Sequence, residues 1–549
     1  MKGAVWPSLF GENIDGKGHF MAIELSGLVV PLGGGDDEIR LSAAAQLHIK
    51  PEEISRMRVV RQSLDARRDV RLVMTVQVTL HDARRQRLLE KKHGSVYSHP
   101  EPQIVYGAKA AGQPVVIGAG PCGLFAALTL AAHGYKPLLI ERGRDMEARV
   151  RDVERLRREG RLDEQSNVCF GAGGAGAFSD GKLTTRIKDP RTERVLQTLA
   201  DCGAPEEILY LAKPHTGTEH IRAAVTGILD RIRLLGGAVS FESQLSGLAT
   251  ADGALNGITY TKGGLPQAVE TGAAVLAMGH SARDTYAMLL DAGIRMAPKP
   301  FAVGLRIEHR REFIDRSQYG QAFGHPALGA AEYRLASRGE DRGVYTFCMC
   351  PGGEVICSAT EPDGVAVNGM SFYARDGENS NSAVVVAVSP ADFDPGTLGG
   401  VAFQRRMEQA AYRLADGFGA PAQTVGDFFD GRATRSFGGV QPSYKPYVAG
   451  ADLHGCLPDF VSTAIKAGLR DFGHKLKGFD MPEAVLTGVE TRTSAPVRLL
   501  RDSEFQADGI AGLFPAGEGA GYAGGIVSAA VDGIKCAEAL MRQFAPPHI

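Results

Sequence analysis

The stretch PVVIGAGPCG, residues 114–123, decides the fold of this chain. Its first four residues form a short apolar run typical of a buried parallel strand, and the run leads directly into a G-x-G-x-x-G turn. The Ala- and Leu-rich segment Leu124 to His133 follows as a helix, and Leu138 to Ile140 forms a second strand that ends at Glu141. The stretch therefore predicts a βαβ unit of the Rossmann type, which binds a dinucleotide.

Each glycine of the turn has a separate role in such a unit. Gly118 makes the tight turn, Gly120 lets the backbone approach a pyrophosphate, and Gly123 allows the helix to pack closely on the strand. The helix N-terminus favours the phosphate charge, and Glu141 can accept hydrogen bonds from ribose hydroxyls. The residues that we expect at the cofactor from this unit are Gly118, Gly120, Pro121, Cys122, Gly123, Glu141 and Arg142.

The C-terminal part of the chain distinguishes FAD from NAD. Residues 512–525, GLFPAGEGAGYAGG, precede a helical stretch from Ile526 to Phe544 and resemble the C-terminal signature of flavoproteins of the glutathione-reductase-like superfamily. The resemblance implies that Glu518 contacts the ribityl chain and pyrophosphate region, although the superfamily more often has Asp there. Residues 271–279, TGAAVLAMG, resemble the superfamily strand that ends in A-T-G. The cofactor residues implied by these segments are Gly279, Gly517, Glu518, Gly524, Gly525 and Ile526.

Longer segments also resemble a bacterial family of uncharacterised FAD-dependent dehydrogenases. They are GAGPCG, FGAGGAGAFSDGKL, KPHTGTEHI, GHSARDT, FCMCPGGEV, NGMSFYARDGENSNSA, GVETRTSAPVR and FPAGEGAGYAGGIVSAAVDG. The likeness extends from about Met21 to the C-terminus. It implies FAD as the cofactor and leaves the substrate open.

A second G-x-G-x-x-G match, Gly171 to Gly176, follows the first by about fifty residues. The preceding residues are polar and mixed, so no buried strand leads into this turn, and a second dinucleotide site is not expected. We expect Gly173, Gly174 and Gly176 to lie against the isoalloxazine ring, because glycine lets backbone N–H groups approach a planar ring. A plain surface loop is the alternative.

The best candidates for catalysis are His280, Lys182 and Arg492, because each lies in a segment that should end close to the ring, with a structural role as the alternative for each. Arg283 and Ser494 are further candidates for substrate contact. His280 is the first choice for a general base, with a packed or capping histidine as the alternative. A local ion pair is an equally good interpretation of Arg283 and Asp284.

Cys348-Met349-Cys350-Pro351 has C-x-C spacing and opens no helix, so we expect a structural turn rather than a thioredoxin-like motif. A metal site that adds Cys357 lacks a fourth ligand at suitable spacing, so no metal is expected. Eight cysteines in a chain of 549 residues form no dense disulfide framework, which favours the cytoplasm.

The predicted fold class is α/β, with a Rossmann-type FAD-binding domain assembled from discontinuous segments. We expect an extension or tag over residues 1–20, with Met21 as the natural-looking start, a small basic α+β domain over 21–105, the FAD-binding domain over 106–299 and 486–549, and an antiparallel-sheet α+β substrate domain over 300–485. In the substrate domain, Asn368, Arg375, Asn379 and Asn381 either bind an anionic substrate group or hold a turn.

The net charge of −2 argues against a chain built as a whole to bind nucleic acid, and no apolar run is long enough to span a membrane. Between Arg56 and Lys92, however, eleven Lys and Arg stand against four Asp and Glu, an excess of seven (11 minus 4). This stretch could contact RNA or an acidic partner, although few aromatic residues accompany it and a solvated face is favoured.

Together these patterns predict an FAD-dependent oxidoreductase that transfers a hydride between a small-molecule substrate and the flavin N5. One alternative is a flavin-containing RNA- or protein-binding factor that uses the basic N-terminal domain. The other is an NAD(P)H-dependent reductase at which the nicotinamide docks transiently, because the chain has one nucleotide domain.

Overall fold

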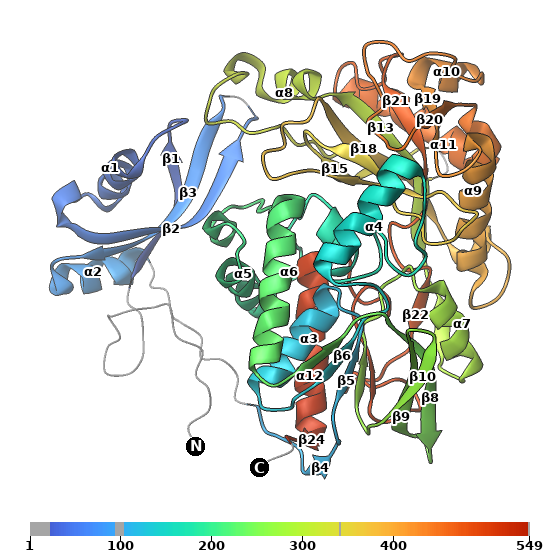
Figure 1. The fold of residues 1–549 in the computed structure, drawn as a ribbon. Helices are drawn as coiled ribbons and strands as arrows, with labels where there is room; N and C mark the ends of the chain where they lie inside the picture. The colour runs from blue at the N-terminus through green and yellow to red at the C-terminus, as the bar shows by residue number, and fades with distance from the viewer. Residues whose placement is uncertain (1–21, 68, 94–103, 340–341, 547–549) are drawn as a thin grey trace.

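The structure is a computed structural model that describes residues 22–546 apart from residues 68, 94–103 and 340–341. The extension expected over residues 1–20, and the start expected at Met21, lie outside the described residues. Figure 1 shows a small N-terminal module beside a larger body, whose five-stranded and seven-stranded sheets lie near opposite ends.

A five-stranded parallel sheet forms the Rossmann-type domain, as the sequence predicts. Its order is β23-β11-β5-β6-β7, and every neighbouring pair is parallel. The strands are β5 (Val115–Ile117), β6 (Leu138–Ile140), β7 (Ala238–Ser240), β11 (Ala274–Leu276) and β23 (Leu513–Pro515). Segments from both ends of the chain therefore share one sheet, so that the fold class is α/β with a discontinuous nucleotide-binding domain.

The two faces of this sheet are covered differently because successive side chains of a strand point to opposite faces. Val116 and Val275 pack with helices α3 (Pro121–Ala132), α6 (Gly217–Leu234) and α12 (Ile526–Gln543). Val115 and Leu276 pack instead with an antiparallel sheet and with helix α7. That side consists of β8 (Ser243–Ala251), β9 (Ala254–Lys262), β10 (Leu265–Glu270) and α7 (Arg283–Asp291).

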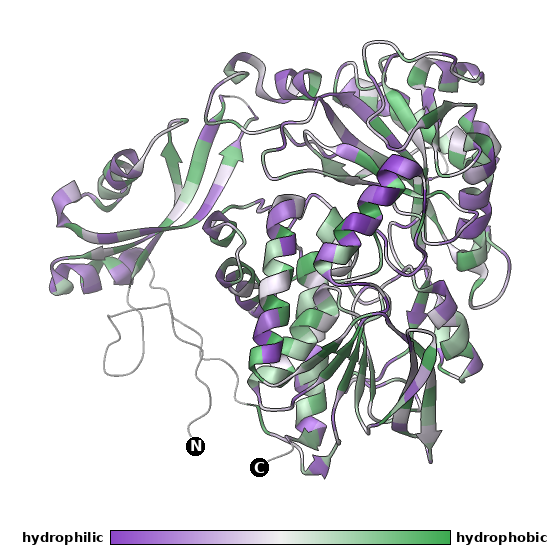
Figure 2. Cartoon of the chain, viewed as in Figure 1, coloured by the Kyte–Doolittle hydropathy of each residue, from purple (hydrophilic) through white to green (hydrophobic). Residues whose placement is uncertain are grey.

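Helices α3 and α12 lie at the centre of the body and are largely apolar, whereas α4 (Met146–Glu159) is largely hydrophilic (Figure 2). Helix α5 (Arg191–Asp201) packs against α12 and α6. Two short pairings complete this part, β4 (Lys109–Ala110) with β24 (Phe544–Ala545) and β12 (Met296–Pro298) with β22 (Val497–Leu499).

The second large sheet has seven strands in the order β14-β15-β18-β13-β21-β19-β20, antiparallel except for β19 and β20. Its strands are β13 (Phe301–Arg310), β14 (Ala336–Ser337), β15 (Val344–Cys350), β18 (Asn379–Val388), β19 (Ala420–Thr424), β20 (Val448–Gly450) and β21 (Val485–Glu490). Around it lie α8 (Arg311–Tyr319), α9 (Gly399–Ala415), α10 (Val425–Asp430), α11 (Asp459–Lys475) and the hairpin of β16 (Glu354–Cys357) and β17 (Val367–Met370). Because β21 pairs with β13 and β19, the boundary expected after residue 485 falls inside a strand of this sheet and has to move beyond residue 490.

The N-terminal module is a three-stranded antiparallel sheet, β1 (Ile23–Val30), β3 (Arg71–Leu80) and β2 (Ile54–Asp65), with helices α1 (Asp36–Leu47) and α2 (Ala83–His93). The sequence pattern of this module predicts a helix near Pro51, but the helix lies earlier in the chain. Helix α1 ends at Leu47, and Pro51 opens only a single 3₁₀ turn, because proline suits the first helical position but lacks a backbone N–H.

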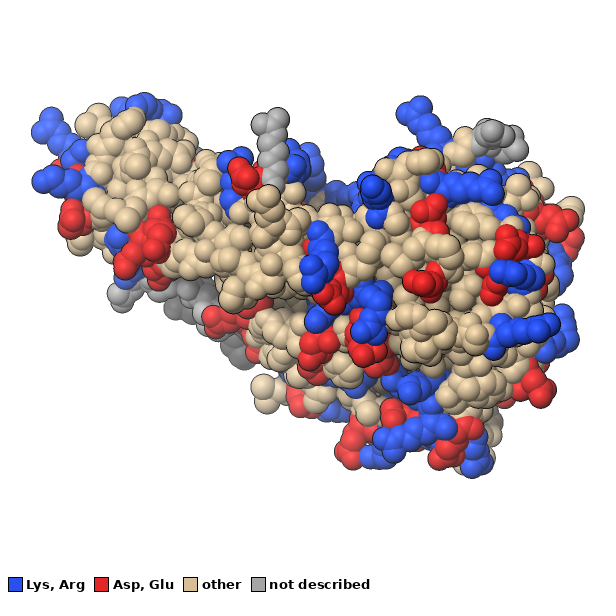
Figure 3. All heavy atoms as spheres, turned by 90° about the horizontal axis from the view of Figure 1, so that it is seen from above, with Lys and Arg blue, Asp and Glu red and all other residues tan. Residues whose placement is uncertain are grey.

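The module joins the body through a backbone bridge. The Gln62 N–H donates to the carbonyl of Tyr210 at 2.7 Å, and the Ala212 N–H donates to the carbonyl of Gln62 at 2.8 Å. Seen from above, acidic and basic side chains both appear on the module and over the rest of that face (Figure 3). In the part of the chain that the structure describes, no helix combines the length and apolar character that a membrane crossing requires.

Candidate functional site

A cavity of about 670 Å³ lies where the two large sheets meet. Residues that follow the carboxyl ends of β5, β11 and β23 line one part of it, among them Gly118, Ala277 and Glu518. Residues of the seven-stranded sheet, including Cys348 and Glu490, line another part. Ligands of open α/β sheets bind at the carboxyl ends of the strands, and the volume is in the usual range of roughly 300–1,000 Å³ for ligand sites.

The first glycine turn is built as the sequence predicts. Gly118 has a φ of +102°, and a Cβ there would overlap the carbonyl of Ala277. A Cβ at Gly123 would overlap the carbonyl of Gly118, whereas a Cβ at Gly120 would find only the Cα of Gly174, at 3.8 Å. Gly118 and Gly123 thus hold the turn together, and Gly120 leaves room on the cavity side. Pro121 and Cys122 also line the cavity, at the start of α3, where no side chain caps the helix.

The second glycine match serves this same turn. No strand leads into it, and the Gly173 N–H donates to the carbonyl of Ala119 at 2.8 Å. A Cβ at Gly174 would lie 2.9 Å from the Cα of Gly120. One at Gly176 would lie 3.2 Å from Ile526, the first residue of α12. The two glycine motifs therefore belong to one site, while the expected contact with the ring stays a prediction.

Arg149 of α4 holds this loop in place. Its side chain is fully buried and donates to four backbone carbonyls at 2.5 to 2.9 Å, those of Asn167, Val168, Ala172 and Gly174. A buried guanidinium needs such acceptors, since an unpaired buried charge is costly. No sequence motif marks Arg149 for this role.

Glu141 connects the two glycine motifs through hydrogen bonds to the backbone of both. Its carboxylate accepts hydrogen bonds from the backbone N–H groups of Ala119 at 2.7 Å, Gly143 at 2.9 Å and Gly171 at 2.8 Å. Because a carboxylate offers about four lone-pair sites, Glu141 can still accept a further hydrogen bond beside these three. The expected hydrogen bond from a ribose hydroxyl stays a prediction.

Arg142, the next residue, also lines the cavity. Its guanidinium pairs with Asp284 at 2.9 Å and lies 4.1 Å from the centre of the Phe170 ring. The local pair expected between Arg283 and Asp284 is therefore wrong, because Arg283 turns instead to Glu361 and Glu408.

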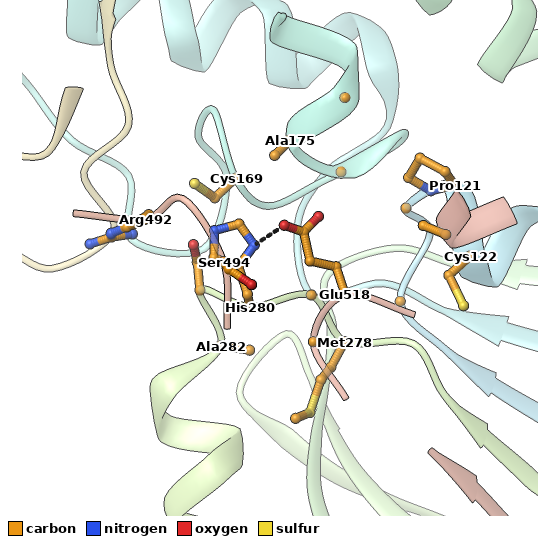
Figure 4. A pocket seen from close by; sticks show the side chains of 18 of the residues that line it. Pro121, Cys122, Cys169, Ala175, Met278, His280, Ala282, Arg492, Ser494 and Glu518 are labelled. Atoms are coloured by element: carbon orange, nitrogen blue, oxygen red, sulfur yellow. Dashed lines mark ion pairs between the residues drawn. The ribbon is translucent and has the colours of Figure 1, made fainter. Parts of the chain in front are cut away.

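His280 lies beside Glu518 (Figure 4), with Nδ1 3.8 Å from the carboxylate. Burial lowers the pKa of His280, and Glu518 opposes this effect. A Cβ at Gly517 would lie 2.8 Å from Cys122, and Gly279 and Gly519 are in close backbone contact. His280 and Glu518 thus lie at the glycine-turn end of the cavity. Gly524, Gly525 and Ile526 line the cavity at the start of α12, where no side chain caps the helix.

The guanidinium of Arg492 extends away from this pair (Figure 4) and is already bound. It donates to both oxygens of Glu408, at 3.1 and 2.8 Å, and to the hydroxyl of Thr360 at 2.8 Å. Arg492 and Ser494 line the cavity, and Ser494 accepts a hydrogen bond from Lys299 at 2.7 Å. The guanidinium N–H groups of Arg492 are therefore bound to Glu408 and Thr360. The expected catalytic role of Arg492 stays a prediction.

Lys182 also lines the cavity and lies 3.0 Å from Asp180. Its ammonium donates to the carbonyl of Met349, and Asp180 in turn pairs with Arg375 at 2.5 Å. Arg375 therefore has a buried partner in Asp180, and it also pairs with the partly exposed Glu332 at 3.1 Å.

The polar cluster expected from Asn368, Arg375, Asn379 and Asn381 does not form one binding turn. Asn379 and Asn381 belong to strand β18, where Asn379 donates to Glu308 and Asn381 accepts from Arg306. Of the four, Asn368 lines the cavity.

An ion pair that no sequence motif indicates also lies at the cavity. Glu490, from β21, lines the cavity and lies 3.0 Å from Arg306 of β13, whose side chain is fully buried. Burial raises the pKa of Glu490 to about 7, although Arg306 acts in the opposite direction. The available signal was the presence of charged residues in two otherwise apolar strands, Arg306 within FAVGLRIEH and Glu490 at the end of VLTGVE.

The cysteines of the C-x-C motif are in strand β15, not in a turn; the turn follows at Pro351. Cys348 lines the cavity and Cys350 is buried. Cys357 lies on β16, and within residues 22–546, apart from the gaps given above, no three His, Cys, Asp or Glu side chains gather as a metal site would require.

Comparisons with known proteins agree with this geometry. A protein of Clostridium beijerinckii, described as an uncharacterized protein, is 45% identical over 536 residues, which cover 96% of this chain and 100% of the relative. Residues 300–493 match the family model of the FAD-dependent protein, C-terminal domain-like. The chain belongs to a family of FAD-dependent proteins. The cofactor of this flavoprotein is FAD. Residues 116–176, which contain both glycine motifs, match an NAD(P)-binding Rossmann-like domain, and residues 22–79 match a domain of unknown function, DUF8436.

Solved structures with some similarity to this flavoprotein include a flavoprotein/dehydrogenase from Cytophaga hutchinsonii, at 12% identity and a TM-score of 0.33, covering 78% of this chain and 76% of the other. Another is the glycine oxidase from Bacillus cereus, at 11% identity and a TM-score of 0.34, covering 78% and 94%. These values are too low to bear on the reaction or the substrate.

Proposed function

We propose that the protein is an FAD-dependent oxidoreductase that transfers a hydride between a small-molecule substrate and the flavin N5. The observation that supports this most is that one cavity is lined both by the glycine turn and by polar residues of the seven-stranded sheet, among them Cys348 and Glu490. A cofactor held at the first part would reach a substrate held at the second.

The residues around the cavity fit FAD. The starts of α3 and α12 both lack side-chain caps, so their free backbone N–H groups can bind anionic or electron-rich atoms. We assign the pyrophosphate to Gly118–Gly123, the adenine ribose to Glu141, and the ribityl chain to Glu518. Gly525 and Ile526 would face the pyrimidine edge, and Gly173–Gly176 the ring.

FAD supplies the hydride acceptor, and the protein orients the substrate and handles the proton. We assign proton transfer to Glu490, because its carboxyl lines the cavity and has a pKa near the pH at which a group can both take up and release a proton. Arg306 holds one of its oxygens, and Asn368, which lines the cavity, is held by the same guanidinium. His280 is less suited, because it lies beside Glu518 at the cofactor end.

The test of FAD binding is the Gly120→Val variant compared with Gly438→Val. A valine at 120 would enter the space left for the pyrophosphate, whereas Gly438 is exposed and a Cβ there meets no atom within 4 Å. We expect the wild type and Gly438→Val to be purified with FAD in equal amounts, measured after acid release, and Gly120→Val to lose it. Stoichiometric FAD in folded Gly120→Val would contradict the assignment of the pyrophosphate.

The substrate is found by anaerobic mixing of the purified protein with metabolites while the flavin absorbance is followed. Loss of the absorbance with a metabolite identifies a dehydrogenase substrate. Loss with NADH or NADPH alone would favour the alternative of a reductase with transient nicotinamide docking. A flavin that no donor reduces, together with salt-sensitive RNA binding, would favour the RNA-binding alternative.

A further inference from the structure

We propose that Cys348 and Cys350 form a reversible dithiol and disulfide pair through which the cavity exchanges two electrons with a thiol or disulfide substrate. The inference rests on the proposed function, because it names the substrate class of the same cavity.

A bulge in strand β15 brings the two thiols together. The strand pairs regularly with β18 up to Phe347 opposite Ala383, and pairing resumes with Cys350 opposite Asn381. Residues 347–350 of β15 thus span the same length as residues 381–383 of β18, so β15 has one extra residue here. Within the bulge Cys348 has a φ of +44°, which is uncommon for a residue other than glycine. In this geometry the Cys350 thiol lies against the backbone of Cys348.

The two thiols differ in access, as an attacking and a resolving cysteine do. Cys348 lines the cavity and is partly exposed, whereas Cys350 is fully buried behind it. The Cys350 thiol donates to the carbonyl of Cys348 at 3.4 Å and lies 3.8 Å from Nη2 of Arg306. A substrate in the cavity would therefore meet Cys348 first.

The charges around the pair favour the thiolate, which is the reactive form of cysteine. Nη2 of Arg306 donates to the carbonyl of Cys348 at 2.6 Å, and the ammonium of Lys182 donates to the carbonyl of Met349 between the cysteines. The hydrogen bond from Cys350, followed by these two cations, lowers the pKa of Cys348 against the effect of burial. Asp180 and Glu490 also face the pair and act in the opposite direction to the cations.

Other buried thiols of the chain lack this environment. Burial raises the pKa of each of four, which are Cys122, Cys357, Cys456 and Cys536. Cys350 also has a raised pKa, because its partner Cys348 takes the negative charge. The thiol with the lowered pKa, Cys348, is therefore also the one that lines the cavity.

The exchange balances as follows for a disulfide substrate. The Cys348 thiolate attacks one sulfur, the substrate S–S bond breaks, and the first thiol leaves with the proton that Cys348 had released. Cys350 then loses its proton and attacks the Cys348 sulfur, which releases the second thiol. The protein pair loses two electrons and two protons, and the substrate gains them. FAD that the hydride donor of the proposed function has reduced would return two electrons and two protons to the pair and restore the dithiol. With thiol substrates each step would run in the opposite direction, and oxidised FAD would accept the two electrons.

The test is a redox titration of the full-length protein with its FAD in buffers of reduced and oxidised dithiothreitol. After acid quenching and alkylation with N-ethylmaleimide, mass spectrometry measures which cysteines are blocked. We expect one reversible transition in which Cys348 and Cys350 lose both adducts together. Cys348→Ser and Cys350→Ser should abolish it, whereas Cys202→Ser, which lies outside the cavity lining, should not. Absence of a disulfide between residues 348 and 350 at every ratio would overturn the inference.

A second measurement remains informative if one variant folds poorly. At pH 7, Cys348 in the wild type should react with iodoacetamide at least tenfold faster than Cys202, whose pKa is raised by burial. Equal rates would count against the inference. FAD is quantified on the same samples, so that bound FAD without thiol exchange rejects the inference alone. Absent FAD rejects the proposed function, and the thiol titration still decides the inference.

Discussion

Glu490 and Arg306 show how single residues set the chemistry of the cavity. Both side chains are buried in the seven-stranded sheet, and they lie 3.0 Å apart. A buried carboxyl pays a desolvation cost in its charged form, so its pKa rises, here to about 7 from 4.5. A group of this kind changes its protonation state in the pH range where a general base works.

Glu490→Gln should change how stability depends on pH. Because the folded pKa is raised, the folded protein binds this proton more tightly than the unfolded chain between pH 4.5 and 7, and the contribution to stability falls as pH rises through that window. We expect the difference in unfolding free energy, wild type minus variant, to fall by up to about 3 kcal/mol from pH 4.5 to 7. Denaturant titrations at several pH values measure it, and a difference that stays constant with pH would contradict the raised pKa.

At the residue scale the sequence predicted the positions that local backbone geometry dictates. Gly118 and Gly123 could be assigned because a side chain at either would overlap the turn itself. Glu490 could not, because its role depends on the pairing of β21 with β13, strands far apart in the chain. For the same reason the sequence could not show that Arg492 turns to Glu408.

Glu408 joins three elements of the structure. It belongs to α9, is fully buried, and pairs at 2.8 Å with Arg283 of α7 and at 2.8 Å with Arg492, which follows β21. Although burial raises the pKa of Glu408, the two guanidinium groups hold it well below its usual range. This carboxylate thus connects the seven-stranded sheet with the Rossmann-type part.

Glu408→Gln should destabilise the protein by about 3–5 kcal/mol, because it leaves two buried guanidinium groups without their shared counter-charge. The control is Glu312→Gln on α8, whose pair with Arg316 is exposed and should contribute less than about 1 kcal/mol. Urea unfolding measures both. A loss at Glu408 as small as that at Glu312 would show that the buried cluster does not join these elements energetically.

The elements themselves were predictable where the sequence carried strong local patterns. Helix α3 and strands β5 and β6 agree with the predicted βαβ unit to within a few residues. The prediction failed at Pro51, where proline marked a turn after a helix rather than the helix itself, and at Cys348, where a strand bulge had been interpreted as a turn.

The molecule as a whole consists of a compact body and a weakly attached module. Among the described residues, two backbone hydrogen bonds join the module to the body, and Gln62 takes part in both. The module has its own apolar core, which includes Ile23, Val76 and Val78. A unit with its own core and few outside contacts can unfold independently.

Calorimetry should therefore show a separate transition for the N-terminal module. Added FAD should raise the midpoint of the main transition and leave that of the module unchanged, because a ligand stabilises only the part that binds it. Gln62→Pro, which removes the N–H donated to Tyr210, should leave FAD binding intact. A single transition that shifts entirely with FAD would show that module and body unfold as one unit.

The discontinuous parallel sheet also determines when the protein can be completed during translation. Strand β23 and helix α12 end at residues 515 and 543 and lie against strands and helices made from residues 115–276. The amino-terminal part of a chain leaves the ribosome first. Strand β11 therefore lacks its partner β23 until nearly the whole chain has been synthesised. On the cofactor assignment proposed above, FAD can bind only after residues 517–526 have been made, so a chain truncated before them should not retain it.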